Sequence, residues 1–282
     1  MAPTTTIVPA SPGRRKPFTG GGHVRSASVP CHSHPLLTHV DDQLLALRSW
    51  TSNPADNPLS LAHVRALLCL LDELLHLPAA ILLAAGDASS STTTETLLHG
   101  FLVLADAFGT FLSSLLALRS HAADLHAAVR RRDIPKIASA ARAHRHLAKD
   151  IAHLAAAVSR DAAACRCATT TAEIRTVAEA INDTAVASAS VFMEVASLVD
   201  AAAAAASPAP ATTKKRLVPA PLRSKKVQLL ASSGDEMREA VALQKLKELE
   251  QCIEEVESES EKVFRSLVQA RVSLLNIHTP TF

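Results

Sequence analysis

The chain has 282 residues, of which 48% are hydrophobic and 20% charged, and its formal net charge is +2. This length allows a sizeable buried core, and the charge argues neither for nor against nucleic acid as a partner. The chain has no Tyr, one Trp, seven Phe and eight Gly, and its apolar residues are mainly the strong helix formers Ala and Leu. The composition therefore argues against a β-rich fold and predicts an all-α, antiparallel helical bundle.

The N-terminal segment, residues 1–34, is predicted to be a disordered basic tail rich in Ser, Thr and Pro. It contains no Asp or Glu, and its basic residues are Arg14, Arg15, Lys16 and Arg25. The same composition suits an organelle transit peptide, so cytoplasmic and plastid locations both stay open. The odd number of cysteines, five, and the lack of an apolar signal core in the first 30 residues predict an intracellular protein with reduced thiols.

Helix signals begin directly after this tail. Pro35 suits the first turn of a helix whose apolar positions continue to Leu47. The breaker SNPADNP ends that helix. Its last two residues, Asn57 and Pro58, are a capping residue and a first-turn proline, and they predict a second helix that reaches about His76.

Two capping boxes predict the starts of longer helices. In each box a Thr is followed three residues later by Glu, so the two side chains can satisfy free N–H groups at a helix start. The boxes are Thr92 with Glu95 and Thr170 with Glu173. The helices that they open are expected to end near Arg131 and Ala206.

Asp133 and Pro135 predict a further helix between these two, running to about Cys165. The helical bundle is therefore expected to occupy residues 35–206. It is followed by residues 207–234, which contain four prolines, six basic residues and no acid. This composition predicts a basic, proline-rich linker.

The last segment, residues 235–278, is predicted to be one long helix resembling a coiled-coil strand. Its apolar positions alternate three and four residues apart over more than four heptads, which is the pattern of an a/d seam. Such a seam must be buried, either against the protein's own helices or against a second copy of the chain. The seam positions are Leu246, Leu249, Ile253, Val256, Ser260, Val263, Leu267, Ala270, Leu274 and Ile277.

Several stretches resemble the plant-specific BYPASS-type family. RSASVPCHSHP at residues 25–35 and ARVSLLNI at 270–277 look like the family's bracketing motifs, and LLHGFLVLADAF at 97–108 is similar to its central helix, with AAVRRRD at 127–133 behind it. The resemblance implies a helical, non-enzymatic protein connected with root and shoot development, and it supplies no catalytic or cofactor residue. The residues of the C-terminal motif are Arg271, Leu274, Leu275 and Asn276.

The sharpest local motif is RSASVP, in the N-terminal tail. Arg25, Ser26, Ser28 and Pro30 have the form Arg-Ser-x-Ser-x-Pro, which resembles the phosphoserine motif that 14-3-3 proteins bind. A phosphate on Ser28 would offer a basic pocket in such a partner two negative charges and three acceptor oxygens. Alternatively, Pro30 and Ser33 merely lead into the first helix and cap it.

Metal and cofactor sites are not expected. His146, Asp150 and His153 share one helix face, but Arg142, Arg145 and Lys149 in the same region would repel a cation. His144 falls on the apolar stripe of that helix and is expected to be a core residue. The sequence holds no glycine-rich phosphate loop, nucleophile elbow or H-E-x-x-H motif, so we expect a protein that is not an enzyme.

A membrane-associated protein is the alternative hypothesis. Residues 97–118 are long enough to span a bilayer, although they include His99 and Asp106. In a bundle, Asp106 would lie at the edge of the apolar stripe or pair with one of the arginines at 130–132. The basic linker could contact anionic lipid, serve as a nuclear-import signal, or simply stay extended in solvent. It has no aromatic residues for stacking bases, so nucleic acid is not an expected partner.

Overall fold

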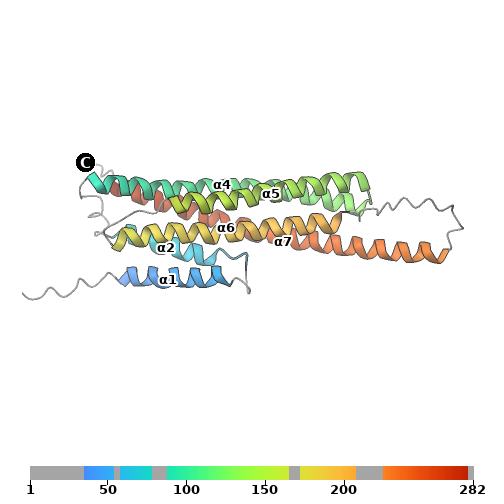
Figure 1. Cartoon of the computed structure of the whole chain (residues 1–282), viewed down its shortest axis with the longest axis horizontal. Coiled ribbons are helices and arrows are strands. Elements are labelled where there is room, and N and C mark those ends of the chain that lie inside the picture. Colours follow the sequence, from blue (N-terminus) through green and yellow to red (C-terminus); the bar gives the residue numbers. More distant parts are fainter. Residues whose placement is uncertain (1–34, 54–57, 78–87, 165–171, 208–224, 279–282) are drawn as a thin grey trace, which may run out of the picture. The chain divides into compact units, whose positions relative to one another are not determined.

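The computed structural model describes residues 35–53, 58–77, 88–164, 172–207 and 225–278, and within these ranges it contains helices and no strand. The prediction of an all-α protein is therefore confirmed for the described part of the chain. Figure 1 shows the helices in chain order. They are α1 (Pro35–Ser52), α2 (Ala62–Leu75), α4 (Ala88–Arg130), α5 (Ile134–Ala164), α6 (Ala172–Ala206) and α7 (Lys225–His278).

The helices pack along one another through their apolar faces. α5 packs against both α4 and α6, and α7 packs against α4. The shorter helices α1 and α2 pack together, with α1 also contacting α6 and α2 contacting α7. Between α4 and α6 the core is aromatic: the ring of Phe192 stacks on Phe111, with centroids 4.0 Å apart, and meets the edge of Phe108 at 5.3 Å. Burial of such large side chains is the main stabilising contribution to a helical core.

The seam of α7 is buried within the single chain. Every seam position from Leu246 to Leu274 is at most 4% exposed, and Ile277 is partly buried against the core. Ser260, the one polar seam residue, is fully buried and its hydroxyl has no hydrogen-bond partner within the described residues. The long helix therefore uses its apolar stripe inside the chain.

Two helix starts differ from the predictions. α2 begins at Ala62, after a turn that includes Pro58; the hydroxyl of Ser60 accepts a hydrogen bond from the Ala62 N–H at 3.3 Å. α4 begins at Ala88, so Thr92 lies inside the helix rather than at a capping box. The Ser and Thr hydroxyls in this stretch can donate hydrogen bonds to backbone carbonyls four residues earlier, as Thr96 does to the Thr92 carbonyl at 2.8 Å. Such side chains are therefore compatible with a helix that starts before Thr92.

The start of α7 is a third difference, because the helix begins at Lys225, inside the segment predicted to be a linker. Pro221 is the last proline of that segment, and beyond it only Gly234 disfavours a helix, by about 1 kcal/mol relative to alanine. The predicted start at Asp235 was based on the periodicity of apolar residues, which does not take the helix propensity of the preceding residues into account. The remaining cap prediction, Thr170, lies outside the described residues.

The turn between α4 and α5 was predicted correctly. Asp133 caps α5, because its Oδ1 accepts the N–H of Lys136 at 3.2 Å, and Pro135 sits in the first turn. The end of α4 is closed by Arg132, whose φ of 54° is left-handed. The N–H of Asp133 bonds the Ala128 carbonyl at 3.1 Å and that of Arg132 bonds Val129 at 3.0 Å, so the turn is a Schellman motif built without glycine.

Candidate functional site

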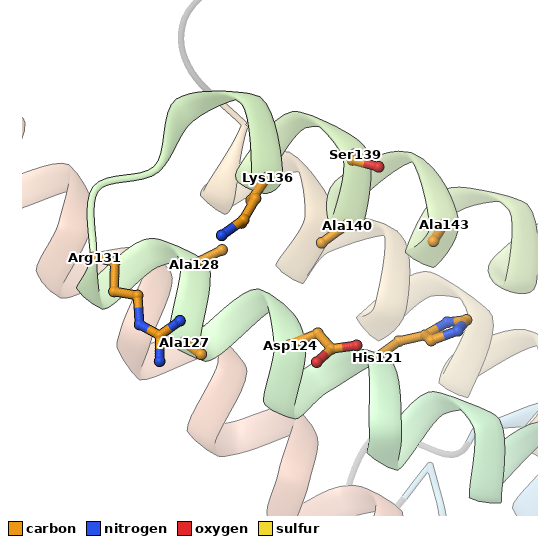
Figure 2. Close-up of a pocket in the computed structure, with 9 residues that line it drawn as sticks. All are labelled: His121, Asp124, Ala127, Ala128, Arg131, Lys136, Ser139, Ala140 and Ala143. Atoms are coloured by element: carbon orange, nitrogen blue, oxygen red, sulfur yellow. The ribbon is translucent and has the colours of Figure 1, made fainter.

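A hollow lies where the end of α4 faces the start of α5 (Figure 2). Its volume is about 500 Å³, which falls within the range of small-molecule sites, roughly 300–1,000 Å³. Both helices contribute to its walls, on either side of the turn at Arg132. The lining residues are His121, Asp124, Ala127, Ala128, Arg131, Lys136, Ser139, Ala140 and Ala143.

Small side chains open this space. Ala127 and Ala128 line it from α4, and Ala140 and Ala143 line it from α5. An alanine carries a single methyl group, so paired alanines cannot fill the gap between two helix axes that leucine or phenylalanine would fill. The hollow is therefore a direct result of the alanine-rich sequence at this turn.

Some charged side chains of the hollow form ion pairs within the protein and others do not. Lys136 forms an ion pair with Asp133, its Nζ lying 3.1 Å from Oδ2. The pKa of the Asp133 carboxyl is lowered, first by the hydrogen bond from the Lys136 backbone N–H and then by the Lys136 side chain, with a smaller contribution from Arg131. The side chains of Arg131 and Asp124 form no hydrogen bond or ion pair with another described residue. The hollow thus holds one guanidinium and one carboxylate without a direct ion-pair partner.

Two histidines lie beside the hollow. The rings of His121 and His144 have centroids 6.2 Å apart. His144 is fully buried, as predicted from its place on the apolar stripe, and its Nδ1 lies 3.1 Å from the Ala140 carbonyl, to which it can donate. Within the described residues, His144 Nε2 and His121 Nδ1 are buried without a partner. Burial lowers the pKa of His144, so its ring is held neutral.

The residues singled out from the sequence lie elsewhere. Arg25, Ser26, Ser28 and Pro30 fall outside the described residues. The C-terminal motif occupies the last turns of α7, with Leu274 buried, Arg271 and Leu275 partly buried and Asn276 exposed. None of the four lines the hollow.

The C-terminal motif is instead a packing element. Beside it, the hydroxyl of Ser273 donates to Asp72 Oδ1 at 2.9 Å and joins α7 to α2. Leu274 is 4% exposed and belongs to the core. Sequence reasoning identified the motif but did not identify Asp72, whose partner lies 201 positions further along the chain.

The other sequence candidates are surface groups. His146 Nδ1 lies 2.9 Å from Asp150 Oδ2 on the solvent side of α5, and the described residues hold no group of three or more His, Cys, Asp or Glu that could bind a metal. Asp106 is exposed at the edge of its stripe and does not pair with Arg132, which binds Glu239 instead. Burial raises the pKa of the Cys252 thiol to about 11, so this cysteine is protonated at neutral pH.

In the part of the chain that the structure describes, the fold defines the class: an all-α protein, with an alanine-walled hollow beside the turn between α4 and α5. The family model described as Protein BPS1 matches residues 60–277, and the chain belongs to that family. This agrees with the resemblance to the BYPASS-type plant family and supports a role connected with plant development. No curated protein matches the chain, and no solved structure matches it.

Proposed function

We propose that this protein is a non-catalytic regulator or scaffold of root and shoot development that acts by binding partner proteins. Family membership supports the developmental role. The observation that carries the binding role is the burial of the α7 seam inside the chain, because it leaves the opposite face of α7, from Glu236 to Ile277, for other contacts. At about 1.5 Å per residue, that face extends over roughly 60 Å.

Ion pairs between helices support a fixed binding surface. Arg119 binds Glu257 at 2.6 Å, and Arg132 binds Glu239 at 2.8 Å; both pairs join α4 to α7. Pairs of this kind at a surface contribute at most about 1 kcal/mol each. Their main effect is to hold α7 in one register, so that its outer face presents a constant pattern of side chains.

Exposed apolar side chains on α7 offer contact points. Met237 and Val241 lie one turn apart and are 70% and 50% exposed, and Val268 and Val272 form a second such pair at 41% and 43%. Apolar pairs at this spacing are what a partner helix engages. A second copy of the chain is one partner that these positions would fit, and other proteins are the alternative.

The N-terminal motif supplies the proposed regulation. A phosphate on Ser28, three residues after Arg25, would create a docking site for a 14-3-3 protein. This arm of the proposal depends on the sequence motif alone, and it can fail without affecting binding through α7.

The membrane alternative has a specific observation of its own. Thr92–Arg130 and Ile174–Ala206 are long and apolar enough to cross a membrane. Three of their largest side chains, Phe108, Phe111 and Phe192, are nevertheless buried in the core, where Phe192 packs against both of the others. Insertion into lipid would have to replace these contacts, which is why we place protein binding first.

The test is affinity purification of the full-length protein from plant tissue, followed by mass spectrometry. We expect specific partner proteins with the parent chain, and selective loss of 14-3-3 proteins with Ser28→Ala. The matched control is Ser11→Ala, in the same tail but without an arginine three residues before it. Equal recovery of 14-3-3 proteins from Ser28→Ala would refute the phosphorylation arm. Absence of any enriched partner, with carbonate-resistant pelleting of the protein, would favour the membrane alternative.

A further inference from the structure

The hollow between α4 and α5 has the properties of a ligand site, and this argument does not depend on the proposed function. The space is set between two helices, and its volume of about 500 Å³ exceeds what a few waters need. Its polar groups come from both helices: His121 and Asp124 from α4, Lys136 and Ser139 from α5.

We infer that the hollow binds a small organic hydroxy acid, with its carboxylate on Arg131 and its hydroxyl on Asp124. The forked guanidinium of arginine binds carboxylates through two parallel hydrogen bonds. The Asp124 carboxylate only accepts hydrogen bonds, so it selects a ligand group that can donate one. Neither side chain has a hydrogen bond or ion pair with another described residue, so both are available to a ligand.

The charges of the hollow disfavour a ligand with two negative charges. Lys136 forms an ion pair with Asp133, and the charges of Arg131 and Asp124 are opposite and equal. A monoanion can place its one carboxylate on Arg131, whereas a phosphate, with nearly two negative charges, would be repelled more strongly by Asp124. In Figure 2 Ala127 lies between Arg131 and Asp124, so the two ends of a ligand would have separate partners.

The walls suit the carbon body of such a ligand. The methyl groups of Ala127, Ala128, Ala140 and Ala143 present apolar surface between the two polar ends. At the inner side, His121 has a ring nitrogen, Nδ1, that is buried and without a partner among the described residues. Burial without a hydrogen bond is destabilising for such an atom, so this side of the hollow holds a polar group that no described residue satisfies.

The test is ligand-observed saturation-transfer NMR with the purified full-length chain. The probes are 4-hydroxybenzoate and 3-hydroxybutyrate, compared with benzoate, 4-hydroxybenzamide and inorganic phosphate. We expect saturable binding of at least one hydroxy acid with a Kd on the order of 1 mM, as suits a ligand of so few atoms. Benzoate lacks the hydroxyl and the benzamide lacks the charge, so each is expected to bind about tenfold more weakly than 4-hydroxybenzoate.

Two matched pairs of variants locate the binding. Arg131→Gln is expected to weaken it about tenfold or more, whereas Arg130→Gln removes the same charge next to the hollow and is expected to leave it unchanged. Ala127→Leu, which fills the hollow, is expected to abolish binding, and Ala123→Leu, on the exposed side of α4, is not. Circular dichroism of each variant confirms that it is folded.

Three results would overturn the inference. They are the absence of saturable binding by both hydroxy acids, equal weakening by the two arginine variants, and binding of phosphate at least as tight as that of the hydroxy acids. Capture of partner proteins from tissue is measured separately, so failure here leaves the proposed function standing, and the reverse also holds.

Discussion

Two stretches of α4 pack very differently against their neighbours. Around Phe108 and Phe111 the helix meets Phe192 of α6 ring against ring, and all three side chains are fully buried. Less than five turns later, Ala127 and Ala128 face alanines of α5, and a space of about 500 Å³ remains. The helix geometry is the same in both places. The volume of the facing side chains thus contributes to whether two helices pack tightly or leave space for polar groups and a ligand.

The largest expected effect on stability comes from removing an aromatic ring from the contact between α4 and α6. Phe192→Ala should reduce the free energy of unfolding by about 3–5 kcal/mol, because it removes buried surface and leaves a cavity between two phenylalanines. Urea unfolding followed by circular dichroism measures this change. Leu116→Ala is the control: Leu116 is 61% exposed on α4, and its loss should change the same quantity by about 0.5 kcal/mol or less. Similar losses for the two variants would mean that the aromatic contact does not hold the core.

A second, smaller effect on stability should distinguish a closely packed position of α4 from a position that lines the hollow. Ala122→Leu adds the same atoms to α4 as Ala127→Leu, but Ala122 is fully buried in close packing whereas Ala127 lines the hollow. Overpacking at Ala122 should cost about 1–3 kcal/mol of unfolding free energy. Filling the hollow at Ala127 should cost less than about 1 kcal/mol, or add stability. Thermal and urea unfolding give both values, and an equal cost at both positions would argue that the hollow closes in solution.

The smallest effect concerns the buried histidine beside the hollow. Because burial lowers the pKa of His144, the unfolded chain binds a proton more readily than the folded one. Stability is therefore complete above the ordinary histidine pKa of about 6.5 and declines as the pH falls below it, by at most about 1.4 kcal/mol per pH unit for one group.

His144→Leu should flatten this decline, as measured by urea unfolding at pH 7 and pH 5. His153→Leu, on the exposed side of the same helix, should keep the pH dependence of the parent chain. If both variants show the parent's decline, titration of His144 is not its cause.

Several features that depend on a single helix were predicted correctly from the sequence. The seam of α7, the burial of His144 and the start of α5 at Asp133 and Pro135 all follow from periodicity or capping within one helix. The starts of α4 and α7 were misplaced because runs of Ser, Thr and Lys tolerate helix without marking where it begins. Local preferences decide such boundaries only weakly.

The candidate site was beyond reach of the sequence for a different reason. Arg131 was noticed as part of a basic cluster, but its availability depends on Lys136, not Arg131, pairing with Asp133. The space itself depends on which alanines of α4 face which alanines of α5. These are properties of the register between two helices, and a single sequence does not report that register.

The heptad pattern of α7 has one further consequence. Sliding the helix by seven residues would place another apolar side chain at nearly every seam position. Apolar contacts by themselves therefore do not exclude a helix that is out of register. The same slide would bring Leu246 or Ser232 to the place of Glu239, opposite Arg132, and would carry Ser273 away from Asp72. These few polar contacts thus select one alignment of α7 from among several that would bury the apolar stripe almost equally well.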